Sequence, residues 1–597
     1  MSCTRPRLLS PLTLLLASSA LFAAACGTSS QGTTLDAAVP QSDAGSQDDA
    51  AVQDDAAPVQ QDAAAASGIG DPCTASGMGQ GTCADGQLCL SEELTQGQLP
   101  GGYCSAQCSG NGDCPSDATC VTAGGGYQLC LKTCAVESDC RGAEGYRCVA
   151  EGGTQICYPW APPPGTIDGG ACVGSDAGPR MNDPGRTFGA SQQLVAPGSS
   201  FMEAETHVVA ASTDGGVRVA AAYIAVFGNG DAKMAVNTSA NGGQSFAAAV
   251  IVDDTLTSAK SDPVLAYSAD RRYLFLTWIG YDYSSGGQTS NMHTFVARSD
   301  DHGLTWGTPV NASGADAGNK DIDKPWITTG PSGEVYVTYM ASQGYDSSIR
   351  VARSVDNGLT FDPPVSAVDA GATDFVNLAY PATDADGNLY VGWIRMAGDQ
   401  NGDAVNDVMV ARWSAGGTWG TFATPVRANT DTDEVVFNDV NLVTAPGAGA
   451  QEVYAIYVAG SADDQRWNVR LAHSADRGAT FSPAITVNDD GTCATHFLPA
   501  AAIDASGRVH VSWYDNRFGT SAGGLFYAAY DPVTHLVGAS QYVSDEAFEF
   551  TIDRSTQNWL GDYTGLFALE NTIFATWADP RGGENTSHVR FARGQLP

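Results

Sequence analysis

Basic residues are scarce in this sequence. Among its 597 residues, Lys and Arg together number 29, against 66 Asp and Glu, and the formal net charge is −37. A nucleic-acid-binding surface needs Lys and Arg to neutralise phosphates, so this composition argues against a nucleic-acid partner. It also argues against adhesion to an anionic membrane through basic patches. Glycine, in contrast, is abundant at 69 residues, which suits a fold of many short strands and tight turns.

Long apolar runs are also few. The one export-like segment, residues 8–22, follows Arg5 and Arg7 and is too short for a confident membrane span. It ends in Ala-Ala-Ala-Cys-Gly at residues 23–27, which resembles the lipobox of bacterial lipoproteins. The resemblance implies a signal peptide at 1–25, a lipid on Cys26 that anchors the chain to a membrane, and a place in the cell envelope. We expect the outer membrane or surface of a bacterium; a cleaved, soluble secretory protein is the alternative.

The segment between the export signal and the first cysteine-rich residues lacks the apolar content of a folded core. Residues 26–70 are rich in Ala, Asp and Gln, and we expect a disordered acidic linker. Residues 71–158 contain twelve cysteines in three similarly spaced sets of four. This segment has no CxxC pair and no His, so the pattern predicts disulfide-bonded repeats rather than zinc sites. Their connectivity is left open, and so is their role as a rigid stalk or a protein-binding module.

Residues 159–185 are rich in Pro, Gly and Asp and predict a second linker. Cys172 lies in this linker. Apart from Cys26, Cys172 and Cys493 are the only cysteines of the exported chain outside the three sets. A disulfide between them, which would pin the linker to the last domain, is a hypothesis.

Residues 186–597 are self-similar. An alternating strand that ends in an aromatic residue recurs at steps of 54 to 64 residues, and its aromatic residues are Tyr223, Trp278, Tyr339, Trp393, Tyr457, Trp513 and Trp577. Alternation with turn residues between the runs predicts antiparallel strands. A repeat of this length is typical of one four-stranded blade of a β-propeller.

A second repeated motif has the form Ser-x-Asp-x-Gly-x-Thr-aromatic. Four good copies occur at blade spacing, with Asn in place of Asp in the first, and Ser414 to Trp419 is a shortened copy. The copies are Ser239, Asn241, Gly243 and Phe246; Ser299, Asp301, Gly303 and Trp306; Ser354, Asp356, Gly358 and Phe361; and Ser474, Asp476, Gly478 and Phe481. This is the Asp box, or BNR repeat, and the region resembles the sialidase-like β-propeller superfamily. In that family the box is structural and lies on the face opposite the binding site.

The order of the strands predicts how the propeller closes. The last unit ends at residues 588–594 without a fourth strand, whereas residues 187–197 resemble the strands that follow the Asp boxes. We therefore predict an all-β fold, a seven-bladed propeller closed by this N-terminal strand, with six blades as the alternative. A small disulfide-rich region precedes it.

Candidate site residues lie in the loops of the face opposite the Asp boxes. Trp-x-Asp-x-Arg occurs twice, with Asp515 and Arg517 in one copy and Asp579 and Arg581 in the other, and Arg395 lies at a related place. The loops entering the first strands carry Glu203, Glu205, His207, Asp321, Asp323, Lys324, His496, Trp559, Asp562 and Tyr563.

The sialidase resemblance implies roles for some of these residues. Arg395, Arg517 and Arg581 would clamp a substrate carboxylate, since guanidinium groups match it, and Asp579 would line the same site. Tyr563 would be the nucleophile, with Asp562 and Asp515 as acid candidates. However, the family's N-terminal Arg segment is absent, and no Glu is clearly placed to activate Tyr563. Intrablade Asp–Arg pairs and a packing role for Tyr563 are the alternatives.

Residues 399–407 have the ligand spacing of calcium loops. Asp399, Asn401, Asp403 and Asp407 alternate carboxylates and an amide as such loops do, so Ca²⁺ is the cofactor we predict, with a solvated acidic loop as the alternative. The sequence as a whole favours a surface protein whose propeller binds a glycan or protein without catalysis. An exo-sialidase-type glycoside hydrolase and a purely structural envelope component are the other hypotheses.

Overall fold

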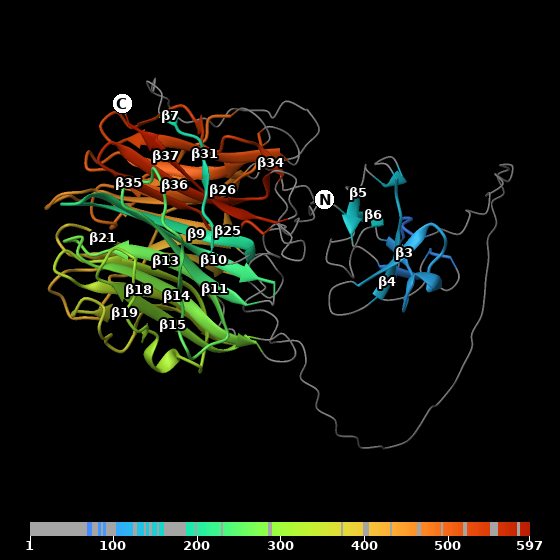
Figure 1. The fold of residues 1–597 in the computed structure, drawn as a ribbon, viewed down its shortest axis with the longest axis horizontal. Coiled ribbons are helices and arrows are strands. Elements are labelled where there is room, and N and C mark those ends of the chain that lie inside the picture. The colour runs from blue at the N-terminus through green and yellow to red at the C-terminus, as the bar shows by residue number, and fades with distance from the viewer. Residues whose placement is uncertain are drawn as a thin grey trace, which may run out of the picture. The chain divides into compact units, whose positions relative to one another are not determined.

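The structure, a computed structural model, describes two parts of the chain (Figure 1). The first is 69–159, without 74–81, 85–86, 91–102, 123–127, 136–138, 142–145 and 152–153. The second is 187–596, without 197–199, 229–230, 284–288, 345, 372–373, 398–404, 430–432, 462–466, 491–493, 518–521, 550–558 and 582–585. These parts belong to two separate compact units. No helix within the described ranges is long and apolar enough to cross a membrane.

The cysteine-rich unit is built from three short antiparallel hairpins. The strands are β1 (Leu88–Leu90) with β2 (Tyr103–Ser105), β3 (Ala118–Thr122) with β4 (Gln128–Lys132), and β5 (Tyr146–Glu151) with β6 (Thr154–Pro159). A 3-10 turn, η1 (Asn111–Asp113), precedes β3. Each hairpin contains the third and fourth cysteine of one set of four.

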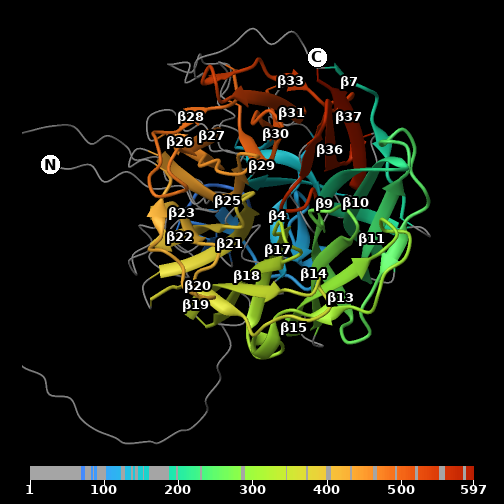
Figure 2. The ribbon, with the colours of Figure 1, turned by 90° about the vertical axis from the view of Figure 1, so that its left-hand side faces the viewer.

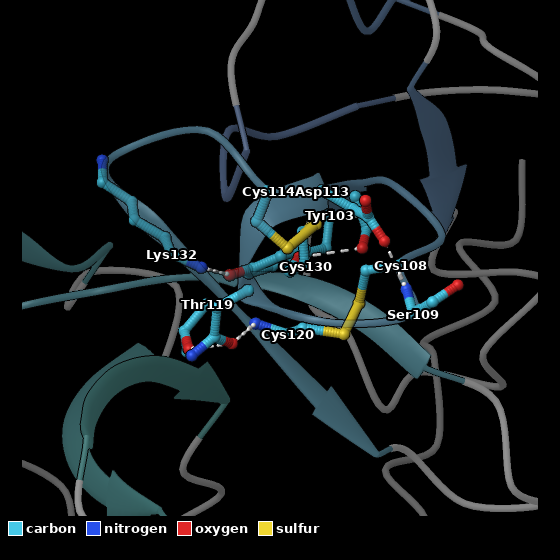
Figure 3. The surroundings of a disulfide bond; sticks show 11 residues. Tyr103, Cys108, Ser109, Asp113, Cys114, Thr119, Cys120, Cys130 and Lys132 are labelled. Carbon is cyan, nitrogen blue, oxygen red and sulfur yellow. Dashed lines mark hydrogen bonds between the residues drawn. A yellow bond between two sulfur atoms is a disulfide. The ribbon is translucent and has the colours of Figure 1, made fainter.

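The disulfides follow one rule in all the pairs that the structure describes. They join Cys73 to Cys89, Cys83 to Cys104, Cys108 to Cys120, Cys114 to Cys130, and Cys140 to Cys157. The first cysteine of a set therefore bonds the third, and the second bonds the fourth (Figure 3). Cross-strand neighbours such as Cys120 and Cys130 are not bonded to each other, so each hairpin is tied to the loops before it.

Tyr103 joins the three hairpins into one body. Its ring is fully buried, its hydroxyl donates to the carbonyl of Cys157 at 3.3 Å, and it accepts the backbone N–H of Lys132 at 2.9 Å (Figure 3). Its neighbours in the core include Leu131 and Ile156. The three sets of cysteines thus share one small core and do not fold as separate modules.

In the second unit, the described strands form seven consecutive antiparallel sheets, the blades of a propeller. Blades 1 to 3 are β9 (Ser200–Thr213), β10 (Gly216–Phe227), β11 (Ala232–Ser239), β12 (Val250–Val252); β13 (Ala259–Tyr267), β14 (Leu274–Tyr283), β15 (Thr289–Ser299), β16 (Val310–Asn311); and β17 (Asp321–Thr329), β18 (Val335–Gln343), β19 (Asp346–Ser354), β20 (Val365–Asp369). A 3-10 turn, η5 (Gly314–Asp316), precedes blade 3.

Blades 4 to 7 complete the ring. They are β21 (Asp374–Thr383), β22 (Leu389–Ala397), β23 (Val405–Trp413), β24 (Val426–Arg427); β25 (Asp433–Thr444), β26 (Val453–Ser461), β27 (Trp467–Ser474), β28 (Ile485–Thr486); β29 (His496–Ile503), β30 (Val509–Asp515), β31 (Ala522–Asp531), β32 (Leu536–Val537), with β33 (Gln541–Tyr542) and β34 (Phe548–Glu549) also on β31; and β35 (Gly565–Leu569), β36 (Thr572–Asp579), β37 (His588–Gln595).

The ring closes between its two ends in sequence. The short strands β7 (Thr187–Phe188) and β8 (Gln192–Gln193) pair antiparallel with β37 and supply the outer edge of blade 7. Figure 2 shows the ring with blade 7 beside blade 1. The predicted count of seven blades and the predicted N-terminal closure are both confirmed.

The repeated aromatic residues fill the space between blades. Each lies within the second strand of its blade, and each is at most 1% exposed. Burying such a side chain removes a large apolar area from water, so one aromatic per blade is an efficient way to stack twisted sheets.

The Asp-box motifs form one turn geometry in the four copies. In blade 3, Ser354 Oγ accepts the N–H of Gly358 at 2.9 Å, and Asp356 accepts the N–H and hydroxyl of Thr360 at 2.9 and 2.6 Å. Gly358 has φ +77°, which favours glycine. We call the end of the blades with these turns the turn face, and the opposite end, where the first strands begin and the second strands end, the entry face.

Candidate functional site

Lys324 lies at the centre of a buried ion cluster contributed by four blades. Its Nζ donates to Asp262 Oδ1 at 2.9 Å and to Asp562 Oδ2 at 2.5 Å, and Glu205 Oε1 is 3.8 Å away. Glu205 also accepts the backbone N–H of Asp262 at 3.1 Å. These residues come from blades 1, 2, 3 and 7, so one ammonium group ties the first three blades to the last.

Backbone bulges position these side chains. The innermost strands β9, β13, β17, β21 and β29 each have a register shift at the same relative place. The bulged residues with left-handed φ are Glu205, Asp262, Lys324, Leu378 and Leu498, at φ +47° to +63°. A bulge leaves one residue unpaired and re-aims its side chain. The shared bulge explains why charged residues 57 to 62 positions apart meet.

Where blade 7 meets blade 1, the position beside this cluster must be a glycine. Gly561 has φ +90°, and a Cβ at that position would lie 2.4 Å from the backbone nitrogen of Glu205. No side chain fits in that space. The backbone before blade 7 can therefore approach blade 1 closely enough for Asp562 to reach Lys324.

The electrostatics of the cluster are unbalanced. Burial disfavours the charge on Lys324, but the carboxylates of Asp262 and Asp562 raise its pKa well above the ordinary value. Burial raises the pKa of Asp323 to about 6, against the lowering effect of the adjacent ammonium. Asp323 accepts the side-chain amide of Asn377 from blade 4 at 3.0 Å. One cation thus faces several buried carboxylates, so its loss would leave them without a counter-charge.

Aromatic side chains fill the part of the propeller's centre that lies next to the Lys324 cluster. Trp326 packs against Tyr380 and Tyr563, with ring centroids 4.5 and 5.2 Å apart. A cavity of about 10 Å³ remains between these rings, Lys324 and Asp562, which is at the limit for one water molecule. The packing leaves no room there for a sugar ring.

Tyr563 is a member of this packed core. It is 2% exposed, and its hydroxyl donates to the carbonyl of Pro263 at 3.2 Å. Asp562 is held by Lys324, as described above. The structure thus brings together two of the residues that the sialidase resemblance implied as catalytic, inside the ring rather than on an open surface.

The two Trp-x-Asp-x-Arg motifs have the same internal contacts. In blade 6, Asp515 Oδ2 accepts the indole N–H of Trp513 at 3.0 Å and Nη2 of Arg517 at 2.7 Å. In blade 7, Asp579 Oδ2 accepts the indole N–H of Trp577 at 2.7 Å, and Nη2 of Arg581 donates to it at 2.6 Å.

The three arginines expected to form a clamp are all bound to carboxylates. Arg395 forms an ion pair with Asp407, its cross-strand neighbour in blade 4. Arg517 also donates to Asp489 at 3.0 Å, and Arg581 also pairs with Asp545. Their guanidinium groups are therefore engaged within the propeller, in contacts worth more than exposed pairs because Arg517 and Arg581 are largely buried.

His496 extends the Asp515 network to blade 5. Its Nδ1 donates to the carbonyl of Trp467 at 2.6 Å, and its Nε2 lies 2.9 Å from Asp490 and 3.2 Å from Asp515. Although burial opposes the charge, the two carboxylates raise the pKa of His496 to about 10. The imidazole is therefore a protonated cation. Because Asp515 Oδ2 already accepts three N–H groups from Trp513 and Arg517, this trio is better suited to an ion network than to a metal.

Several other residues singled out from the sequence lie outside the described residues. These are Asp399, Asn401 and Asp403 of the proposed calcium loop, the lipidation candidate Cys26, and the cysteines of the hypothetical bridge, Cys172 and Cys493. Asp407 is described; besides Arg395, it lies 3.6 Å from Arg427.

Sequence reasoning missed Asp262 altogether. Glu205, Asp323, Lys324 and Asp562 were recognised as entry-loop residues, but nothing predicted that they would meet. A usable signal was present: Pro follows the bulged residue at Asp262, Lys324 and Leu498, and Pro inside an inner strand marks a bulge.

Comparisons with solved structures find other β-propellers. A protein of unknown function from Dyadobacter fermentans is 14% identical, over 69% of this chain and 100% of its own, with a TM-score of 0.41. A Hadza microbial sialidase is 14% identical, over 61% of this chain and 74% of its own, at 0.39. An α-L-arabinanase from Penicillium chrysogenum is 13% identical, over 59% and 100%, at 0.40. No family model and no curated protein matches the chain.

Proposed function

We propose that this chain is an exported cell-envelope protein, anchored by a lipid on Cys26, whose propeller binds a glycan or protein ligand without catalysis. The observation that carries the non-catalytic part is the position of Tyr563. A nucleophile must reach the substrate, yet this hydroxyl is buried and donates to the carbonyl of Pro263.

The arginines support the same conclusion. A carboxylate clamp needs guanidinium groups that can turn their N–H donors to the ligand. Arg517 and Arg581 donate instead to two carboxylates each. Recruiting them for a substrate would break these bonds. Asp515 and Asp579, both fully buried, would each lose a guanidinium donor.

A glycan array and a turnover assay on the exported chain, from residue 27 onward, test this proposal. We expect a reproducible ligand on the array, or on a panel of surface proteins, and no release of phenol from a fluorogenic sialoside. Turnover that Tyr563→Phe abolishes would establish the glycoside hydrolase instead. Absence of any ligand would favour a purely structural component.

Calcium belongs to the same proposal. If Asp399, Asn401, Asp403 and Asp407 bind Ca²⁺, calorimetry will record binding heat that Asp403→Ala removes. A chain that gives no calcium heat would eliminate this part while leaving the ligand-binding part intact.

A further inference from the structure

Tyr283 is an exposed aromatic residue on the entry face of blade 2. It ends strand β14 and is 56% exposed, whereas most aromatic residues of the propeller are buried. Its ring makes an edge contact with Tyr281, with centroids 5.2 Å apart, and the two hydroxyls lie 3.3 Å apart. Tyr281 is 9% exposed and packs in the core with Ile322 and Tyr339 of blade 3. A buried ring thus holds the exposed one in place.

The residue before Tyr283 is held by hydrogen bonds. Asp282 accepts the backbone N–H of Ser258 at 2.9 Å and the side-chain amide of Asn291 at 2.8 Å, and these bonds lower the pKa of its carboxyl. Asn291 Oδ1 in turn bonds His293 Nε2 at 2.7 Å. An aromatic surface held this way loses little conformational entropy when a ligand covers it.

The charged side chains of the loop that contacts Asp282 are paired, in contrast to the strongly acidic chain. The loop that contacts Asp282 carries Asp253 and Asp254, and two lysines neutralise them. Lys260 Nζ lies 2.7 Å from Asp253 and 3.8 Å from Asp254, and Lys233 lies 3.2 Å from Asp253. Asp282 itself bonds the neutral donors of Ser258 and Asn291, so the anion next to Tyr283 disfavours an acidic sugar and can still accept the hydroxyl groups of an uncharged one.

We propose that Tyr283, supported by Tyr281, is a stacking platform for the face of an uncharged sugar residue. This inference rests on the proposed ligand-binding function and narrows it to a class of ligand. The C–H face of a pyranose is apolar and carries slight positive charge, which suits the negative face of a tyrosine ring. The surrounding hydroxyl, amide and carboxylate groups accept bonds from sugar hydroxyls without requiring a charged ligand.

The test is an array of neutral and sialylated oligosaccharides probed with the exported chain, followed by affinity measurements on the hits. We expect neutral glycans to bind, Tyr283→Ala to weaken them at least tenfold, and Tyr283→Trp to keep the affinity within about threefold. Leu304→Ala is the matched control, because Leu304 is 54% exposed but lies in an Asp-box turn on the opposite face. That variant should bind as the wild type does.

Each outcome separates the platform from the proposed function. Glycan binding that Tyr283→Ala leaves unchanged, with an unaltered melting temperature, would overturn the platform while the binding function stands. Binding only of sialylated glycans, or of a basic peptide, would overturn the inference that the ligand is an uncharged sugar. Binding of no glycan at all would overturn the platform and leave only a protein ligand for the proposed function.

Discussion

Replacing Lys324 by methionine tests the physical account of the ring centre. Methionine has a similar length and no charge, so the change removes the ammonium group and little volume. The carboxylates of Glu205, Asp262 and Asp562 would stay buried without their cation. Removing one partner of a buried ion pair costs about 3–5 kcal/mol, and we expect a loss of about that size at pH 7.5.

The pH dependence has a definite sign. The pKa of Lys324 is raised in the folded state above its unfolded value of about 10.5, so the ammonium stays protonated in both states between pH 4.5 and 7.5 and its own titration adds no pH dependence there. Any variation in that window comes from the carboxylates. In Lys324→Met they are destabilising when ionised, and protonation relieves this. The deficit of the variant should therefore shrink by more than half from pH 7.5 to pH 4.5.

Urea unfolding followed by tryptophan fluorescence, at both pH values, measures these differences. The control is Lys320→Met, since Lys320 pairs with Asp316 at 3.2 Å but is 32% exposed, and such a pair contributes roughly 0–1 kcal/mol. A second variant, Lys324→Met with Asp562→Asn, should recover part of the loss. The reasoning is refuted if Lys324→Met costs no more than Lys320→Met, or if its deficit is the same at both pH values.

Three further predictions follow from individual contacts. The pKa of Asp356 is lowered to about 2 by bonds from its Asp-box turn, so the advantage of wild type over Asp356→Asn should vanish as the pH falls from 4 to 2, as melting temperatures will record. The pKa of His496 is raised to about 10, so the wild type should be more stable than His496→Gln by its full margin below pH 6.5, and this margin should decline towards pH 10. The urea midpoints of the two proteins will measure it. Arg581→Lys should destabilise blade 7 by about 1–3 kcal/mol, because lysine cannot hold Asp579 and Asp545 together; hydrogen exchange of β36 and β37 will report it.

The parts of the fold that could be predicted from sequence are local and repeated. A blade is a continuous stretch of chain, and its aromatic residue and turn motif recur at nearly constant steps, so one pattern is read several times. Closure followed from the same count, because a blade lacking its fourth strand needs one from elsewhere. The short strand at Thr187–Phe188 lies where that count placed it.

The ion cluster could not be predicted, for reasons of geometry. Asp262 reads as an ordinary Asp-Pro turn signal, and only the ring arrangement brings it beside Lys324 and Asp562, which is 300 residues further along the chain. The disulfides failed to follow from sequence for a related reason. Four cysteines allow three pairings, and strand register alone would suggest bonding Cys120 to Cys130, which face each other across a hairpin.

The carboxylate excess decides which groups on the entry face can meet a ligand. With more than two Asp or Glu for each Lys or Arg in the chain, a guanidinium group near the ring finds an intramolecular partner first, as Arg517 and Arg581 do. A ligand that competes for these arginines must offset the cost of leaving the buried Asp515 or Asp579 without one of its cations. A ligand that stacks on an uncharged ring such as Tyr283 disturbs no ion pair. The same charge balance that makes an arginine clamp costly therefore favours recognition through aromatic stacking.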